Sequence, residues 1–189
     1  IRGYLHSARG VNCTADQIII GAGSEYLMML LTQILGTSRT IAMENPTYRQ
    51  AYRVFESLGC QMKPVEMDAH GMNVRLLEES GADIAYVMPS HQYPMGVVMP
   101  VKRRQELLSW AGRGEKRYLI EDDYDSEFRY RGKPVPALQG MDIQGKVIYM
   151  GTFSKSIAPA IRVGYLVLPA PLLAVYKRKC GFYASTVSR

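Results

Sequence analysis

The chain has 189 residues, of which 47% are apolar and 21% are charged, and its formal net charge at pH 7 is +6. This length and composition are typical of one globular domain with a sizeable core. No apolar run approaches the roughly 20 residues that a membrane-spanning helix needs, so a membrane protein is not expected.

Strands and helices are predicted to alternate from a helical opening at residues 1–10 onward. We predict strands at 17–23, 39–43, 60–67, 83–89, 117–124, 146–151 and 163–169, and helices at 24–36, 46–59, 73–81, 101–113 and 170–180. Ser24 is expected to cap its helix and Gly36 to end it, and Pro46 is expected in the first turn of the next helix. Apolar strands separated by helices indicate an α/β fold with a mostly parallel, mixed sheet. No domain boundary is apparent within 1–189.

Basic residues concentrate at 101–104 and 176–179. We interpret these runs as two solvated helix faces rather than a nucleic-acid site, because no aromatic residues are interleaved to stack on bases. The three cysteines, Cys13, Cys60 and Cys180, match no zinc or disulfide spacing. With no signal peptide apparent at the start, they favour a cytoplasmic protein, and the scattered histidines argue against a metal site.

Polar clusters follow several of the predicted strands, at 21–25, 44–48, 90–96, 121–127 and 151–156. In such sheets ligands bind at the carboxyl ends of the strands, so a site built from many loops is expected. The segment 21–26 could bind a phosphate at a helix N-terminus, although a simple tight turn is as plausible. It is neither a GxGxxG nor a Walker A loop.

The other clusters each allow two interpretations. A carboxylate among Asp122, Asp123 and Asp125 could hold a proton on a ring nitrogen and make the ring an electron sink; taken alone, a solvated acidic turn is favoured. Tyr48 could cover a flat ring or pack on the next loop. His91 and Gln92 could bond a ring hydroxyl, but a structural role in the loop is favoured for each taken singly.

Lys155 carries most of the functional argument. It lies between Thr152, Ser154 and Arg162, in a loop bounded by two apolar strands. A lysine that forms a Schiff base must lose its proton, which burial and nearby positive charge promote. Arginine is suited to phosphate. This combination favours a site for a phosphorylated aldehyde over a basic surface loop.

Residues 151–165 resemble the lysine segment of fold-type I pyridoxal-phosphate proteins, the class I/II aminotransferase group. The order of motifs agrees along the whole chain: glycine turn, aromatic residue, proline-glycine loop, aspartate–tyrosine, lysine, arginine. The resemblance implies a three-layer αβα large domain that binds pyridoxal 5'-phosphate (PLP) and covers 1–189. Segments 90–100 and 121–140 resemble the aminotransferase-like domains of MocR/PdxR regulators, a branch of the GntR family. Tyr93 and Asp123 depart from ordinary aminotransferases and favour that branch.

The resemblance implies a role for each matched residue. Lys155 would bind the cofactor covalently, as the catalytic residue. Asp122 would pair with the ring nitrogen, Tyr124 would bond the ring oxygen, and Tyr48 would stack on the ring. His91 or Gln92 would take the oxygen-side contact that asparagine makes in ordinary members. The phosphate would be held by Ala22, Gly23, Ser24, Thr152, Ser154 and Arg162. No metal is implied.

The resemblance also implies two parts outside this chain, an N-terminal winged helix-turn-helix that binds DNA and a carboxyl-terminal small domain. We therefore expect a fragment of a homodimeric regulator that senses PLP or its adduct with an amino compound. A working class I/II aminotransferase is the alternative, and a fold that has lost its cofactor is a third possibility. Whether the chain retains catalysis is left open, with a regulatory role favoured.

Overall fold

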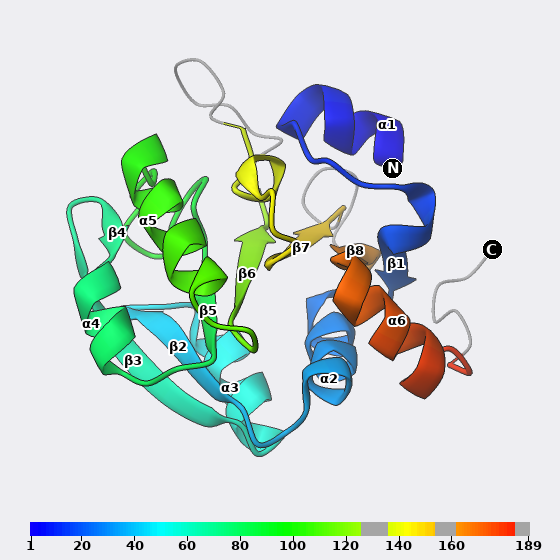
Figure 1. Cartoon of the computed structure of the whole chain (residues 1–189), viewed down its shortest axis with the longest axis horizontal. Coiled ribbons are helices and arrows are strands. Elements are labelled where there is room, and N and C mark those ends of the chain that lie inside the picture. The colour runs from blue at the N-terminus through cyan, green and yellow to red at the C-terminus, as the bar shows by residue number, and fades with distance from the viewer. Residues whose placement is uncertain (126–135, 154–161, 184–189) are drawn as a thin grey trace.

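One sheet of eight strands forms the centre of the fold (Figure 1). The structure is a computed structural model and describes residues 1–125, 136–153 and 162–183. The strands are β1 (Ile18–Gly21), β2 (Thr40–Asn45), β3 (Gln61–Asp68), β4 (Gly71–Met72), β5 (Ile84–Val87), β6 (Tyr118–Asp123), β7 (Val147–Thr152) and β8 (Gly164–Val167). Their order across the sheet is β1-β8-β7-β6-β5-β2-β3-β4.

The middle of this sheet is parallel and its edges are antiparallel. Strands β7, β6, β5, β2 and β3 run in the same direction, whereas β8 is antiparallel to both β7 and β1, and β4 is antiparallel to β3. The prediction of a mostly parallel, mixed sheet is confirmed. Among the strands in the part of the chain that the structure describes, β4 alone was not predicted, because two residues are too short to show an alternating pattern.

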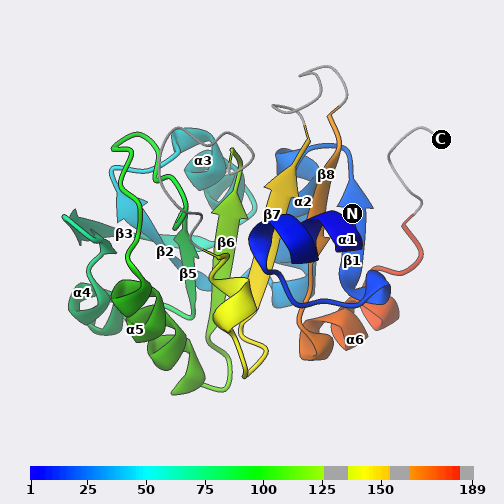
Figure 2. The ribbon, with the colours of Figure 1, turned by 90° about the horizontal axis from the view of Figure 1, so that it is seen from above.

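Helices cover both faces of the sheet. They are α1 (Arg2–Tyr4), the π-helix η1 (Leu5–Arg9), the 3₁₀ helix η2 (Ala15–Gln17), α2 (Ser24–Leu35), α3 (Arg49–Ser57), α4 (Val74–Glu79), α5 (Val101–Gly112), the 3₁₀ helix η3 (Gln139–Met141) and α6 (Ala170–Lys179). Figure 2 shows α2 and α3 behind the sheet, with α1 and α5 in front of it. This arrangement confirms the three-layer αβα fold.

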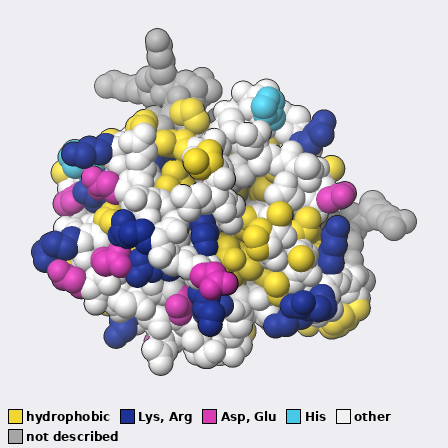
Figure 3. Space-filling view, in the orientation of Figure 1, with side chains coloured by type: hydrophobic (Ala, Val, Ile, Leu, Met, Phe, Trp, Pro, Cys, Tyr) yellow, Lys and Arg dark blue, Asp and Glu magenta, His cyan; other side chains and the backbone are white. Residues whose placement is uncertain are grey.

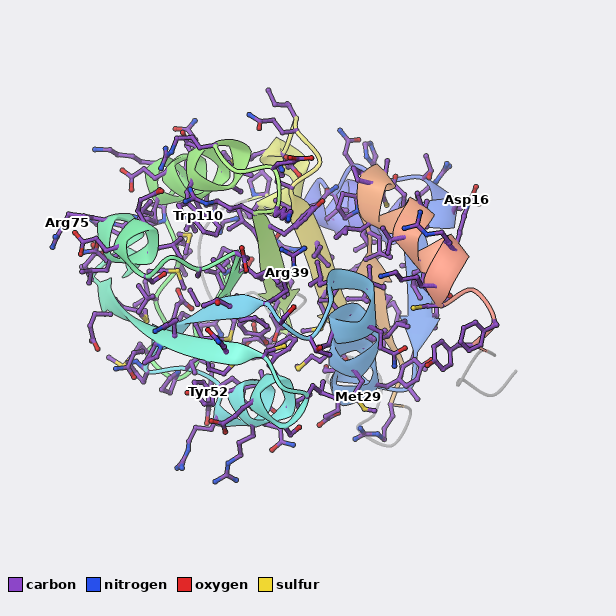
Figure 4. The ribbon with its side chains drawn as sticks, turned by 60° about the horizontal axis from the view of Figure 1, so that its bottom comes forward. Asp16, Met29, Arg39, Tyr52, Arg75 and Trp110 are labelled. Carbon is purple, nitrogen blue, oxygen red and sulfur yellow. The ribbon has the colours of Figure 1, made fainter. Side chains whose placement is uncertain are left out.

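The two faces of the sheet form separate parts of the core. On β2, Ile41 and Met43 pack in the cluster that includes α2 and α3, while Ala42 packs with α4 and α5. Trp110 of α5 is fully buried on the second face (Figure 4). Because both faces are covered, the central strands read as nearly continuous apolar runs rather than as alternating ones.

The predicted N-cap of α2 and the predicted start of α3 are wrong. The N-cap of α2 is Gly23, with φ of 90°, and Ser24 is the first helical residue. Glycine adopts this positive φ without the steric penalty of a side chain, so Gly23 rather than Ser24 occupies the N-cap position. Helix α3 begins at Arg49, and Pro46 lies in the preceding loop, where its carbonyl accepts a hydrogen bond from Gln92 Nε2 (2.8 Å). The predicted end of α2 at Gly36 is confirmed.

The prediction of solvated basic faces holds for one of the two runs. Lys177, Arg178 and Lys179 on α6 are exposed, but Arg104 on α5 is fully buried. Its guanidinium donates to three backbone carbonyls, those of Met99, Pro136 and Pro89. On the face in Figure 3, basic and acidic side chains are interspersed on the left, and basic ones lie along the right and lower edges of an apolar area on the right.

Within the described ranges, the helices are too short or too polar to cross a lipid bilayer.

Candidate functional site

A cavity of about 370 Å³ lies where β6 and β7 end and α2 begins. Its lining includes seven of the predicted site residues, which come from distant parts of the sequence: Gly23, Ser24, Tyr48, Asp122, Tyr124, Thr152 and Arg162. The expectation that strand-end clusters would meet at one edge of the sheet therefore holds for these residues. A larger hollow of about 800 Å³ lies alongside, over α3, and shares Tyr48 and Tyr93 with this cavity.

One end of the cavity is formed by the start of α2 and the side chain of Arg162. A Cβ atom added to Gly23 would lie 3.0 Å from Arg162 Nη2, a tight contact, so the guanidinium lies close against the helix start. Arg162 also donates from Nη2 to Glu25 Oε2 at 2.9 Å. Thr152, at the end of β7, donates its hydroxyl to the Val163 carbonyl (3.3 Å). A helix N-terminus beside an arginine is an arrangement that binds anions.

The cavity lining also contains the carboxylate of Asp122. Its Oδ2 accepts a hydrogen bond from the hydroxyl of Tyr86, a fully buried residue of β5. Burial raises the pKa of Tyr86 well above its ordinary value, and the negative charge of Asp122 adds to the shift, so Tyr86 stays protonated and donates.

Asp123 lies on the opposite face of the sheet from Asp122. It pairs with Arg9 Nε at 2.8 Å and accepts a hydrogen bond from Tyr149. The alternation of side chains along a strand therefore gives the cavity Asp122 alone of this pair. Asp125 pairs instead with His91, whose Nδ1 lies 2.6 Å from its carboxylate. The carboxylates of Asp122, Asp123 and Asp125 therefore have different partners and separate roles.

Three tyrosines, Tyr48, Tyr93 and Tyr124, form aromatic walls of the cavity. Tyr48 packs edge-on against Tyr93, with ring centroids 6.0 Å apart. Burial raises the pKa of Tyr48, and the nearby charges of Glu25 and Asp122 raise it further. Burial also raises the pKa of Tyr124, and the charges of Asp125 and Asp122 raise it further. The hydroxyls of Tyr48 and Tyr124 therefore remain protonated near neutral pH.

Three of the predicted residues are not part of the lining. His91 stacks on the ring of Tyr124, with ring centroids 6.2 Å apart. Gln92 is buried and its side chain holds the loop together, donating to the Pro46 carbonyl and accepting from Met95 N at 3.0 Å. Ala22 is half-buried and precedes the turn.

The predictions for Ser154 and Lys155 fall outside the described residues. Glu25, Met88 and Tyr93 line the cavity but were not among the predicted site residues. Glu25 follows Ser24 directly, so its place in the first helical turn was a signal available in the sequence. Met88 and Tyr93 follow β5, and only the packing of the loop after that strand brings them to the cavity.

The sequence matches the family described as aminotransferase class I and II over residues 1–188. It is 43% identical to the uncharacterized HTH-type transcriptional regulator YdeL of Bacillus subtilis over 98% of this chain and 40% of that protein. It is 38% identical to the probable rhizopine catabolism regulatory protein MocR of Rhizobium meliloti, over 93% of this chain and 36% of that protein. The chain thus spans about 40% of the length of the curated relatives it matches.

The structure is similar to that of kynurenine aminotransferase from Pyrococcus horikoshii, which was solved with PMP, with a TM-score of 0.85 and 31% identity. The match covers 97% of this chain and 48% of that one.

Proposed function

Because the chain belongs to the aminotransferase class I and II family, we propose that it is the PLP-binding, effector-sensing domain of a MocR/PdxR-type transcriptional regulator of the GntR family. The observation that carries the proposal is that the start of α2, Arg162 and Asp122 line one cavity. Such a cavity matches a flat cationic ring that carries a phosphate.

The residues at the phosphate end have the donors that a phosphate needs. The N-terminus of α2 carries a partial positive charge, and Gly23 leaves room for the Arg162 guanidinium beside it. We propose that Gly23, Ser24, Thr152 and Arg162 hold the phosphate. Ser154 is proposed to add a further hydroxyl, and Ala22 a backbone amide.

The residues at the ring end fit a pyridine ring with a protonated nitrogen. Asp122 would hold a proton at that nitrogen, and the Tyr86 hydroxyl fixes the orientation of the carboxylate. Tyr48 would cover one face of the ring, and Tyr124 would orient its hydroxyl toward the ring oxygen, with His91 and Gln92 supporting that side. When bound, PLP supplies an electron sink and an aldehyde, to which we propose Lys155 bonds.

The relatives support a sensor in preference to an enzyme. YdeL and MocR are named as regulators, and the chain spans only about 40% and 36% of their lengths. We propose that this chain is the large cofactor-binding domain of a longer cytoplasmic, homodimeric protein, whose separate winged helix-turn-helix binds DNA. Its signal would be PLP or an amino compound that reacts with it.

A class I/II aminotransferase remains the second candidate. It is favoured by the similarity to the kynurenine aminotransferase structure, which was solved in complex with PMP and with KYN as a substrate. A sensor needs a ligand that binds two conformations of the protein with different affinity, whereas an enzyme needs repeated turnover and product release.

The test is a gel shift of the full-length protein on its native promoter, with and without PLP. We expect binding to one operator that weakens steeply with salt and changes when PLP is added. Lys155→Ala is the control, because it removes the covalent attachment. In parallel, borohydride reduction and peptide mass spectrometry should find PLP on Lys155. Turnover of an amino acid without any DNA binding would support the aminotransferase and overturn the regulator.

A further inference from the structure

The described lining of the cavity is negatively charged, although the proposed ligand is an anion. Its formally charged residues are two carboxylates, Glu25 and Asp122, and one guanidinium, Arg162. Asp122 has a role at the ring end, where a positive charge has to be balanced. Glu25 has no such role, because it lies at the end that we assign to the phosphate.

Glu25 bonds the residue that the phosphate needs. Its Oε2 lies 2.9 Å from Arg162 Nη2, the same nitrogen that approaches the Cβ position of Gly23. The carboxylate therefore engages the guanidinium on the side that faces the start of α2. The two side chains are 40% and 60% exposed, so solvent screens the pair and its contribution to stability is small.

The ordinary explanation of Glu25 is that an acidic residue in a first turn stabilises the helix dipole. That explanation accounts for its position on α2 but not for its pairing with Arg162 inside the cavity. It also does not explain why the charge of Glu25, like that of Asp122, adds to the increase that burial causes in the pKa of Tyr48. The charges of Glu25 and Asp122 thus act within the same cavity.

We propose that Glu25 competes with the ligand phosphate for Arg162 and so lowers the affinity of the site for phosphorylated ligands. This inference rests on the proposed function, and it names a residue that sets how the site responds to the concentration of its ligand. A phosphate that enters the site has to share the guanidinium with a carboxylate and bear the repulsion of that charge. Weakened phosphate binding makes occupancy respond to ligand concentration, which a sensor requires and a tightly loaded enzyme does not.

The test compares the full-length wild type with Glu25→Gln, using equilibrium dialysis against two probes, PLP and pyridoxal, which lacks the phosphate. Glutamine keeps the size of the side chain and removes its charge. We expect Glu25→Gln to bind PLP about three- to tenfold more tightly, from Coulomb repulsion at a partly solvated site. Its affinity for pyridoxal should stay within twofold of wild type.

Two further variants separate competition from a general change in charge. Glu25→Asp keeps the negative charge and should gain less than Glu25→Gln. Glu56→Gln removes an exposed carboxylate from the neighbouring hollow and should leave PLP affinity unchanged. Unchanged or weaker PLP binding in Glu25→Gln, or an equal gain with pyridoxal or in Glu56→Gln, overturns the inference. Absence of PLP binding in the wild type and every variant overturns the proposed function, and this inference with it.

Discussion

Asp122 and Asp123 are adjacent in sequence and carry the same chemical group, yet their surroundings give them different tasks. Asp122 faces the cavity and accepts from Tyr86, while Asp123 is buried on the other face against Arg9. A carboxylate in a cavity can balance the charge of a ligand. A carboxylate already paired with a buried arginine instead stabilises the fold.

Asp122→Asn should therefore weaken PLP binding about 10- to 100-fold, because a neutral amide cannot balance a pyridinium charge. The visible absorption of the bound cofactor should also shift, and a spectrophotometric titration measures both effects. The matched variant Asp123→Asn should keep its PLP affinity but lower the free energy of unfolding by about 3–5 kcal/mol. The opposite pattern would assign the ring nitrogen to Asp123.

Glu44 of β2 is a buried carboxyl that makes stability depend on pH. It is 1% exposed, and burial raises its pKa from 4.5 to about 7, although backbone hydrogen bonds from Met88 and Met72 partly offset the shift. Between pH 4.5 and 7 the unfolded chain has lost this proton and the folded chain has kept it. The free energy of unfolding therefore falls as pH rises through this range, and the loss is complete above the folded pKa.

Glu44→Gln should remove this pH dependence. Between pH 4.5 and pH 8, the free energy of unfolding should therefore fall by up to about 3 kcal/mol less in Glu44→Gln than in wild type. Urea unfolding followed by Trp110 fluorescence at both pH values measures the difference. Some pH dependence should remain, because burial also raises the pKa of Glu121 to about 7. Identical pH profiles for wild type and Glu44→Gln would show that Glu44 titrates normally in the folded protein.

At the scale of the elements, apolar periodicity and glycine positions were enough to predict every strand except β4 and every long helix. They could not predict the π-helical geometry of Leu5–Arg9 or the buried state of Arg104. A basic run such as 101–104 has the composition of a solvated face. Whether one of its members turns inward depends on carbonyls contributed by Pro89 and Pro136, which are distant in sequence.

Arg104 connects α5 to two loops, and its removal should be costly for stability. Arg104→Met fills a similar volume but leaves the carbonyls of Met99, Pro136 and Pro89 without this donor. We expect the free energy of unfolding to fall by about 2–4 kcal/mol, since several buried acceptors lose a charged donor. Lys102→Met, at an exposed position of the same helix, should change it by less than about 0.5 kcal/mol. Equal stability of the two variants in urea unfolding would contradict this role.

At the scale of the whole molecule, parallel strands explain why the site was partly predictable. Their carboxyl ends meet at one edge of the sheet, so clusters after separate strands had to lie near one another. The sequence could not tell that Gln92 faces the loop interior, that Tyr93 lines the cavity, or that Glu25 pairs with Arg162. These details depend on side-chain packing between loops, which no local pattern encodes.

The first residues of the chain are joined to the sheet behind the cavity through one buried arginine. Arg9 donates to Asp123 Oδ2 at 2.8 Å and to Ser90 Oγ at 2.7 Å, and its carbonyl accepts from Ala137 N. It thereby ties the N-terminal helix to the loop after β5 and to the end of β6. Both elements also contribute to the cavity, through Tyr93 and Asp122.

A double-mutant cycle measures how strongly this contact couples the two parts. Arg9→Met alone should lower the free energy of unfolding by about 3–5 kcal/mol, because it leaves Asp123 charged and buried without its cation. In the double variant Arg9→Met/Asp123→Asn no uncompensated charge remains, so the loss should be smaller than the sum of the single losses by about 1–3 kcal/mol. Arg2→Met, at an exposed position of α1, should have almost no effect. Strict additivity in the cycle would mean that Arg9 and Asp123 stabilise the protein independently, and that this ion pair does not couple the N-terminal helix to β6.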